Sequence, residues 1–267
     1  MSIGLPVAMF LLALGMALAM GFAWRIAERR DTHGHIDAIW TVSTGLACVI
    51  GALMPLETSW LPRRLAVAGI AALWSLRLGG HMIARARSAR DDPRYAALRA
   101  GWGENAARRL FLFLQIQALA GFILVLAVRA AAQRPGDGLR PADLLGVALA
   151  VLAIAGAALA DRQLARFRAD PAHRGRICEE GLWRFTRHPN YFFEWLGWVA
   201  YPVIGFEGVR DYPFGAFTLS APLLIYVILV HGSGIPPTEA HMSATRGAAF
   251  RDYQRRVNAF WPGPPRR

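Results

Sequence analysis

Long apolar blocks dominate this sequence and leave few folds open to it. Hydrophobic residues make up 55% of the chain, which is too apolar for an ordinary soluble domain. The blocks are long enough to cross a bilayer as helices. The sequence therefore predicts an all-α integral membrane protein with about seven transmembrane helices, at residues 3–24, 35–55, 64–84, 110–130, 142–163, 190–208 and 214–232.

The blocks follow one another without a linker, a repeat or a low-complexity stretch, so we expect a single membrane domain over residues 1–267. The N-terminal helix with its loop takes up about residues 1–33, and residues 34–267 form the rest. The first block carries its arginines after the apolar run, as a retained helix does and a cleaved signal peptide does not. From residue 233 a polar tail follows, with helical spacing over 238–258.

Arginine sets the expected orientation of these helices. All 30 basic residues are arginine, and the net charge is +12. The loops after the first, third and fifth helices and the tail hold 23 arginines, whereas the opposite loops hold 6. The positive-inside rule then predicts an outside N-terminus and a cytoplasmic C-terminus. Abundant Ala and Gly without lysine are typical of GC-rich bacterial genes, so we expect a bacterial inner membrane.

The positions of the arginines along the chain also limit the kinds of binding partner that we expect. Arginines that lie between apolar segments suit anionic membrane lipid and a phosphate-bearing ligand better than nucleic acid, so no nucleic acid is expected. Cys48 lies in an apolar segment and Cys178 in the basic stretch. Two cysteines so placed do not predict a disulfide framework or a zinc site. His33, His35 and Asp37 alternate at a loop–helix junction without further ligands, so we expect no metal site.

Ionisable residues inside membrane segments are costly and are functional candidates for that reason. Asp37 begins the second predicted helix, Arg77 and His81 lie on the third, and Glu194 lies on the sixth. Arg77 and His81 are four residues apart and share a helical face. Asp37 and Arg77 could also form a buried ion pair that only orients two helices.

A second candidate is the basic stretch from Arg166 to Trp198, where arginines, turn formers and aromatics are dense. Arginine presents a planar fork of donors that matches phosphate oxygens, so the stretch is a candidate anion cradle. A basic loop beside an apolar segment is also what the positive-inside rule produces without any ligand. Asn190 and Glu194 follow on one face of the next helix.

The order of residues in this stretch resembles the C-terminal half of the steroid 5-alpha-reductase family, most closely its bacterial branch of membrane proteins. The stretches that carry the resemblance are GLWRFTRHPNYFFE (181–194), RFRADPAHRGRIC (166–178), WSLRLGGHMIARARSARDDPRY (74–95) and GIPPTEAHMSATRGAAFRDYQRRVNAFWP (234–262). It extends from about Asp37 to the tail. Phe193 stands where that family usually has glycine.

This resemblance implies NADPH bound among the later helices and loops, without a Rossmann fold. Asp161, Arg168, Arg176 and Asn190 match the cofactor-binding positions of the family. Arg187, His188 and Tyr191 of the HPNY motif, Glu194, and His241 and Tyr253 of the tail are further candidates, with Arg246 beside them. The family polarises an enone carbonyl with a Glu and a Tyr from its second and third helices. No Tyr lies in those helices here, so Asp37, Arg77 and His81 are the catalytic candidates.

The function expected is a membrane-embedded, NADPH-dependent reductase of a conjugated double bond in a lipophilic, steroid- or isoprenoid-like substrate. Isoprenylcysteine carboxyl methyltransferases share the superfamily and have a similar arginine–histidine–proline motif followed by an aromatic residue. A membrane methyltransferase that uses S-adenosylmethionine is therefore one alternative. A non-enzymatic membrane protein whose arginine loops only bind anionic lipid is the other.

Overall fold

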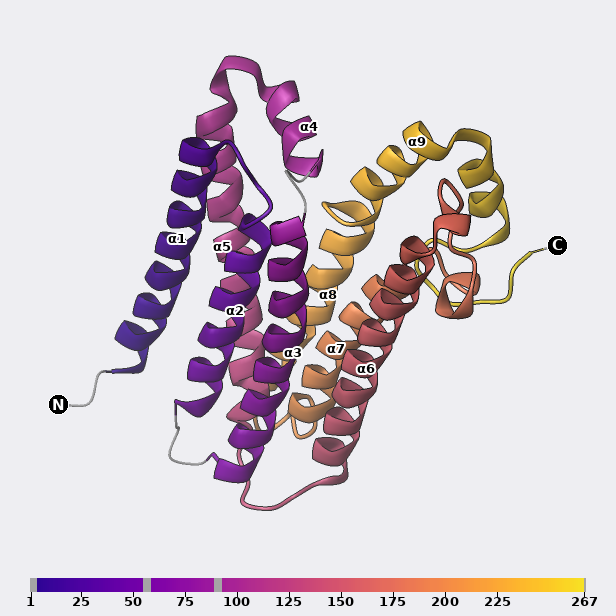
Figure 1. Cartoon of the computed structure of the whole chain (residues 1–267). Coiled ribbons are helices and arrows are strands. Elements are labelled where there is room, and N and C mark those ends of the chain that lie inside the picture. The colour runs from indigo at the N-terminus through magenta and orange to yellow at the C-terminus, as the bar shows by residue number, and fades with distance from the viewer. Residues whose placement is uncertain (1–3, 55–58, 89–92, 267) are drawn as a thin grey trace. The chain divides into compact units, whose positions relative to one another are not determined.

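The computed structural model describes residues 4–54, 59–88 and 93–266, and Figure 1 shows how their helices are arranged. Within these ranges the regular structure is helical, apart from two isolated bridges from Ser59 to Pro135 and Gly136. Six helical runs in the described chain are long and apolar enough to cross a membrane. The prediction of a helical, multi-pass membrane protein is confirmed.

The first five predicted membrane helices lie close to their predicted positions. They are α1 (Leu5–Arg30), α2 (Ile36–Leu53), α3 (Leu61–Ser88), α5 (Ala106–Ala132) and α6 (Pro141–Ala169). The predicted helix ends at residues 3 and 55 lie outside the described residues. The sixth predicted helix is α7 (Pro189–Gly205), which contains Pro202. Proline begins both α6 and α7, because a first helical residue has no backbone hydrogen bond to lose.

The seventh predicted helix is not one regular α-helix. Residues 213–231 form a 3-10 segment η4 (Pro213–Leu219), a short α8 (Ser220–Tyr226) and a π segment η5 (Val227–His231). The run ends where the N–H of Gly234 donates to the carbonyl of Ile228 at 3.2 Å. Gly234 lies so close to the carbonyl of Leu229 that a Cβ would be 2.5 Å from its oxygen, so the end of this run depends on glycine.

Two further helices lie mainly outside the apolar blocks. α4 (Pro93–Trp102) was not predicted, and η1 (Gly103–Asn105) joins it to α5. α9 (Ile235–Arg256) confirms the helical tail. Its helix is interrupted at Gly247, whose φ of 55° is a left-handed conformation that glycine adopts without steric cost.

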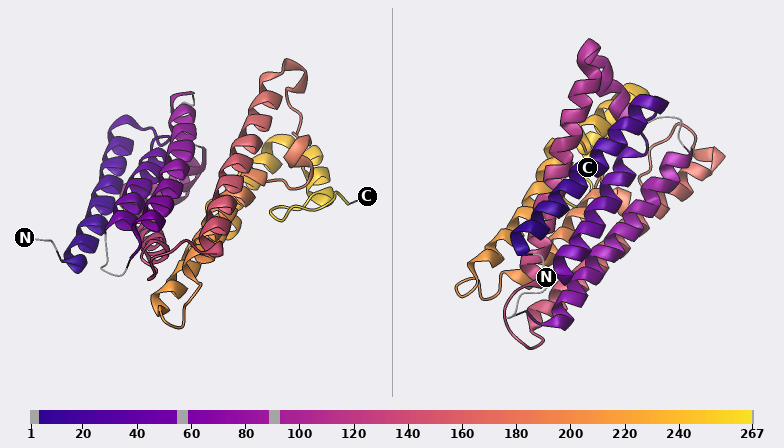
Figure 2. Two further views of the ribbon diagram at one scale, coloured as in Figure 1. Left: turned by 90° about the horizontal axis from the view of Figure 1, so that it is seen from below. Right: turned by 90° about the vertical axis from the view of Figure 1, so that its left-hand side faces the viewer.

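The described chain forms two compact units. The first contains residues 1–147 and 201–221, and the second contains residues 148–200 and 222–267. Figure 2 shows the helices of the first unit running alongside one another. In this unit α2 packs on α3 and α5, and α1 packs on α5 and α2.

Small residues let the helices of the first unit approach closely. A Cβ on Gly45 of α2 would lie 2.1 Å from the Cβ of Ser75 on α3, and a Cβ on Gly121 of α5 would lie 2.5 Å from Met16 of α1. Helices in membranes depend on such contacts because lipid offers no hydrophobic drive to bring them together. The indole of Trp40 donates to the carbonyl of Gln117 at 2.9 Å and ties α2 to α5.

Elsewhere in the first unit, a buried polar cluster joins the first turns of α3 and α6 to the loop between α5 and α6. The carboxylate of Asp143 accepts from Arg63 at 3.0 and 3.3 Å and from Arg134 at 3.0 and 3.1 Å, and all three residues are at least 95% buried. Arg129 donates to the carbonyls of Gly51 and Met54 at 2.9 Å and so caps the C-terminus of α2, where a cation is favoured. The ion pairs of Asp143 hold the first turns of α3 and α6 against the loop between α5 and α6.

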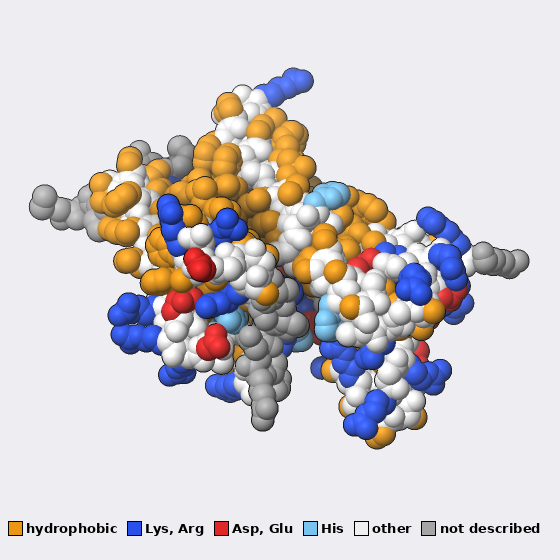
Figure 3. All heavy atoms as spheres, turned by 90° about the horizontal axis from the view of Figure 1, so that it is seen from above, with side chains coloured by type: hydrophobic (Ala, Val, Ile, Leu, Met, Phe, Trp, Pro, Cys, Tyr) orange, Lys and Arg blue, Asp and Glu red, His pale blue; other side chains and the backbone are white. Residues whose placement is uncertain are grey.

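Large apolar side chains remain exposed along the candidate spans. Leu76 is 73% exposed, and Phe10, Leu18 and Ile116 are each exposed by 64% or more. Figure 3 shows such side chains in broad patches, with arginines largely apart from them. Patches of this size would cause aggregation in water, but they suit contact with lipid.

The second unit combines most of α6 and α7 with α8, α9 and the C-terminal segment. Phe193 of α7 lies against Gly156 of α6, where a Cβ would lie 2.4 to 2.7 Å from the phenyl ring. The C-terminal half of α9 is anchored by a buried cluster of Phe250, Tyr253 and Val257. This unit contains the basic stretch singled out in the sequence.

Candidate functional site

A pocket of about 330 Å³ opens in the basic loop that follows α6. The loop folds back through the 3-10 turn η2 (Pro171–His173), which Asp170 caps by accepting the N–H of Ala172 at 2.9 Å. Gly175 follows with a φ of 83°, a conformation that favours glycine. These two turns bring the arginines at either end of the loop to one pocket.

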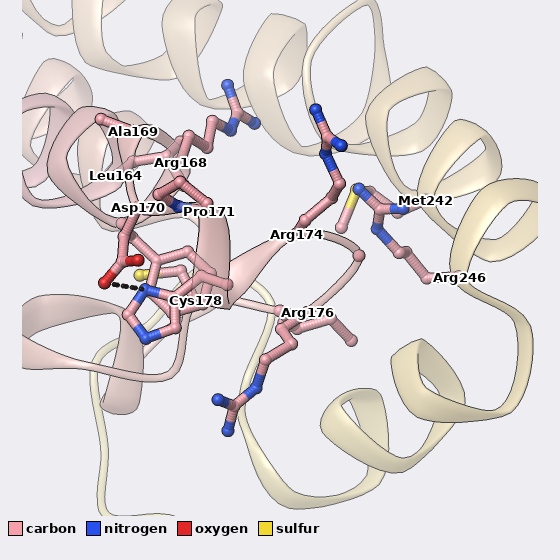
Figure 4. A pocket seen from close by; sticks show the side chains of 14 residues that line it. Leu164, Arg168, Ala169, Asp170, Pro171, Arg174, Arg176, Cys178, Met242 and Arg246 are labelled. Atoms are coloured by element: carbon pink, nitrogen blue, oxygen red, sulfur yellow. Dashed lines mark ion pairs between the residues drawn. The ribbon is translucent and has the colours of Figure 1, made fainter.

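Four arginines line this pocket: Arg168 in the last turn of α6, Arg174 and Arg176 of the loop, and Arg246 of α9. Figure 4 shows the guanidinium groups of Arg168, Arg174 and Arg246 extending to one side of the loop, whereas Arg176 extends to the other. All four residues are exposed, so their charges remain accessible to a ligand. One acidic residue, Asp170, also lines the pocket. The donor set suits an anion with several oxygens, such as a phosphate.

Aromatic residues form the wall beneath the arginines. The rings of Phe167 and His173 stack at 4.1 Å and 6°. Phe167 also packs with Cys178 and Trp183 in a small buried cluster, and the indole of Trp183 donates to the carbonyl of Ala160 at 3.0 Å. His173 Nδ1 is buried and makes no hydrogen bond within the described residues, and the carboxylate of Asp170 is 3.8 Å away. The pocket thus offers a flat ring face beside its charges.

Two of the predicted cofactor residues meet between α6 and α7. The amide of Asn190 donates to the carboxylate of Asp161 at 3.2 Å, and both side chains are half-buried. Glu194 lies one turn further along α7 and accepts from the indole of Trp198 at 3.4 Å. The sequence placed Asp161 and Asn190 at one site, and the structure brings them together.

The first residue of the HPNY motif, His188, and the preceding Arg187 contact α9 rather than the pocket. The Arg187 guanidinium donates to both carboxylate oxygens of Glu239, at 2.7 and 3.1 Å. His188 Nε2 lies 3.1 Å from the same carboxylate, and its ring stacks on Tyr191 at 5.3 Å. Burial lowers the pKa of His188 below its ordinary value, although the bond to Glu239 opposes this. Arg187 and His188 therefore hold α9 in place.

The two tail residues predicted at the cofactor site lie outside the pocket lining. Tyr253 is 2% exposed, and its hydroxyl donates to the carbonyl of Trp183, so it belongs to the core of the unit. His241 is exposed on α9 next to Met242, which does line the pocket. Arg246 is the tail residue that reaches the pocket.

In the first unit, Asp37 is the centre of a polar network on α2. The hydroxyl of Tyr95 donates to its carboxylate at 2.9 Å, and Arg94 forms an ion pair with it. The amide of Gln117 donates to the Tyr95 hydroxyl at 3.3 Å. An ion pair between Asp37 and Arg94 of α4 is thus present, while the suggested pair of Asp37 with Arg77 stays a prediction.

Tyr95 is the functional candidate that sequence reasoning missed. It is 4% exposed, and burial and the neighbouring charge of Asp37 raise its pKa well above the usual value, so the phenol keeps its proton. It lies on α4, outside the helices in which an enone-polarising Tyr was sought. The signal was present, because Tyr95 ends the stretch WSLRLGGHMIARARSARDDPRY that carries the family resemblance.

The other candidates of the first unit lie on α3 and in the segment before α2. Arg77 is half-buried and His81 exposed, four residues apart on α3. His33 stacks on Tyr95 at 6.0 Å, whereas His35 Nε2 bonds to the carbonyl of Ala23 at 2.9 Å. Among the residues that the structure describes, no group of three or more His, Cys, Asp or Glu is placed to hold a metal ion.

Comparison with known proteins places the chain in a family. Residues 23–257 match the family model described as "Protein of unknown function (DUF1295)". The chain belongs to the DUF1295 family. No curated protein and no solved structure matches it. The DUF1295 match covers both the basic pocket of the second unit and the Asp37–Tyr95 network of the first.

Proposed function

We propose that this DUF1295 protein is a membrane-embedded, NADPH-dependent reductase of a conjugated double bond in a lipophilic, steroid- or isoprenoid-like substrate. The observation that carries the proposal is the pocket that four arginines from α6, the following loop and α9 line together with two stacked rings. The sequence resemblance to the steroid 5-alpha-reductase family supports the same assignment.

The residues present fit the phosphate and ribose groups of such a cofactor. The pocket arginines would neutralise its phosphates, because their planar forks match phosphate oxygens. Asp161 and Asn190 offer an acceptor and an amide beside it in the same unit. When bound, NADPH would supply a hydride to the β-carbon of the substrate's double bond. The chain's own residues must bind the cofactor and stabilise the charge that develops on the substrate.

Tyr95 and Asp37 are the pair proposed to act at the substrate carbonyl. Tyr95 stays protonated and would turn its O–H from Asp37 to the carbonyl oxygen, where negative charge develops. Arg94 would keep the Asp37 carboxylate in place, so that the phenol has a fixed acceptor between turnovers. Tyr95 thus replaces Arg77 and His81 as the leading donor in this proposal.

We infer seven crossings with the N-terminus outside and the C-terminus in the cytoplasm of a bacterial inner membrane. α7 and the 213–231 run would supply the sixth and seventh crossings, and the arginine asymmetry of 23 against 6 supports the orientation. Fusions of alkaline phosphatase and of a fluorescent protein test it. Fluorescence from a fusion after residue 266 and phosphatase activity before residue 4 are expected, and the reverse pattern would overturn the orientation.

Binding to detergent-purified protein is the primary test. NADPH, NADP and S-adenosylmethionine would each be titrated and followed by calorimetry and thermal shift. We expect NADPH to bind and the Arg168→Gln/Arg176→Gln double variant to lose roughly 100-fold in affinity, since a charged hydrogen bond contributes about 1.5–3 kcal/mol. Arg166→Gln is the matched control, because Arg166 is exposed on α6 and does not line the pocket.

A second variant separates binding from chemistry. Tyr95→Phe should leave NADPH affinity unchanged and lower the rate of enone reduction by roughly 100-fold, the usual effect of removing one donor to a developing oxyanion. Binding of S-adenosylmethionine with no effect of NADPH would move the assignment to methyl transfer. Binding of neither would contradict both enzymatic readings.

A further inference from the structure

The C-terminal segment after α9 is ordered although it is not helical. Residues 257–266 lie back along the turn that precedes α7, and Figure 1 draws them in yellow beyond α9. The N–H of Arg187 donates to the carbonyl of Asn258 at 2.9 Å, and the N–H of Gly263 donates to the carbonyl of Phe185 at 2.9 Å. The Thr186 hydroxyl bonds to the carbonyls of Ala259 and Phe260 at 3.0 Å. These hydrogen bonds make residues 257–266 an integral part of the second unit.

Its two aromatic residues complete a cluster of five rings. Phe260 and Trp261 pack against Phe192 and Trp195 of α7 and against Tyr226 of α8, with ring centroids 5.1 to 6.1 Å apart. Phe260 is 3% exposed, but Trp261 is 50% exposed. The Trp261 indole N–H donates to none of the residues that the structure describes. A half-exposed tryptophan that packs against other rings suits a boundary between apolar and polar surroundings.

The cluster lies where two apolar helices begin or end. Phe192 and Trp195 are in the first two turns of α7, and Tyr226 precedes the end of the 213–231 run. On that run Leu223 and Val227 are 65% and 55% exposed, on either side of Tyr226. Half-exposed Trp261 therefore packs at the ends of two apolar segments whose neighbouring side chains are also exposed.

Exposed residues beside Trp261 have the matching chemistry. Phe185, whose carbonyl holds Gly263, is 45% exposed. Arg184 precedes it, and Arg266 follows Trp261, and both arginines are exposed. Aromatic rings with flanking arginines are typical of the headgroup layer of a membrane, where rings lie near the acyl boundary and cations bind lipid phosphates.

We infer that residues 257–266 are a bilayer anchor, in which Trp261 and Phe185 insert into the headgroup layer of an anionic membrane while Arg184 and Arg266 bind lipid phosphates. The surface does not depend on any cofactor or reaction. Its partner is the lipid of the surrounding leaflet, because exposed rings that pack on the ends of apolar segments are flanked by exposed arginines. The anchor would fix the turn before α7 from the membrane side.

Fluorescence quenching in nanodiscs tests the anchor on the full chain. In a background with the buried cysteines changed to alanine, an environment-sensitive fluorophore would be attached to Trp261→Cys and, separately, to Phe185→Cys. The control is Ala249→Cys, at an exposed alanine of α9. Lipids spin-labelled near the top of the acyl chain should quench both anchor sites several-fold more than the control. Lipids labelled near the end of the chain should quench them less.

The lipid charge gives a second, independent readout. Quenching at residue 261 should be stronger in phosphatidylglycerol than in phosphatidylcholine nanodiscs, and Arg184→Gln with Arg266→Gln should remove that difference. Quenching at 261 and 185 no greater than at 249 would overturn the anchor and leave the exposed rings for a protein partner. Equal quenching in both lipids would overturn the assignment of the two arginines to lipid phosphate.

Discussion

Replacing Asp143 by asparagine should destabilise the first unit strongly. Its carboxylate is the shared acceptor of Arg63 and Arg134, whose side chains are 1% and 2% exposed, and it also accepts the N–H of Arg140 at 3.0 Å. Asp143→Asn keeps the shape but removes the charge between two buried guanidinium groups. Breaking one partner from a buried ion pair typically costs about 3–5 kcal/mol, because the remaining charge is uncompensated.

The structure places the expected loss at the lower end of that range. Arg134 keeps a second carboxylate, Glu207, at 2.7 Å, although that side chain is 42% exposed. Among the residues that the structure describes, Arg63 keeps neutral acceptors, the carbonyls of Arg134 and Gly138 at 2.7 and 3.1 Å. We therefore expect a loss of about 3 kcal/mol, which lowers the melting temperature on the order of 10 °C for a chain of this size.

The chain's own cysteines provide the assay. Cys48 and Cys178 are both buried, so a thiol-reactive dye that fluoresces on reaction reports unfolding in detergent. Asp137→Asn is the control, since Asp137 is exposed in the same loop. If the two variants melt together, the carboxylate at residue 143 does not hold the buried arginines in place, and the reasoning from the ion pairs is refuted.

Two more predictions concern the second unit. Burial, aided by the charge of Arg187, holds the pKa of His188 below its ordinary 6.5 despite Glu239, so the unfolded chain binds this proton more readily than the folded protein does. Stability from neutral His188 is complete above about pH 6.5 and declines as the pH falls below it, and melting curves should show a steeper acid loss than in His188→Gln. Gly156→Ala should cost about 1–3 kcal/mol by forcing a Cβ against Phe193, and Phe193→Ala should suppress that cost in a double-mutant cycle.

The helices could be predicted from the sequence because the length and apolar character of a membrane helix are local properties. α1 to α3, α5 and α6 follow directly from that signal. The run 213–231 is just as apolar, yet it is divided into 3-10, α and π segments. α4 has too few apolar residues to stand out. The division of the 213–231 run and the formation of α4 both depend on tertiary contacts, which a hydropathy profile does not describe.

The sequence predicts which residue types form the candidate site, but not which of these residues contact one another. The arginines of the 166–187 stretch are alike in sequence, yet Arg168 and Arg176 line the pocket while Arg187 is bound to Glu239. Which of them faces a ligand depends on the backbone turn at Gly175. In the same way, the contact between Asp37 and Tyr95 joins residues 58 apart in the chain. Helical spacing predicts neighbours within one helix and says nothing of such a contact.

Phe193 shows how a large side chain on one helix depends on a small residue on its neighbour. Its phenyl ring on α7 needs space on α6. Gly156 provides it, since the ring lies where a side chain at 156 would be. The hydrogen bond between Asp161 and Asn190 at 3.2 Å joins the same two helices, at positions five residues after Gly156 and three before Phe193. The helix spacing that brings Asp161 and Asn190 together therefore depends on Gly156. The role of this glycine becomes clear only from its contact with Phe193.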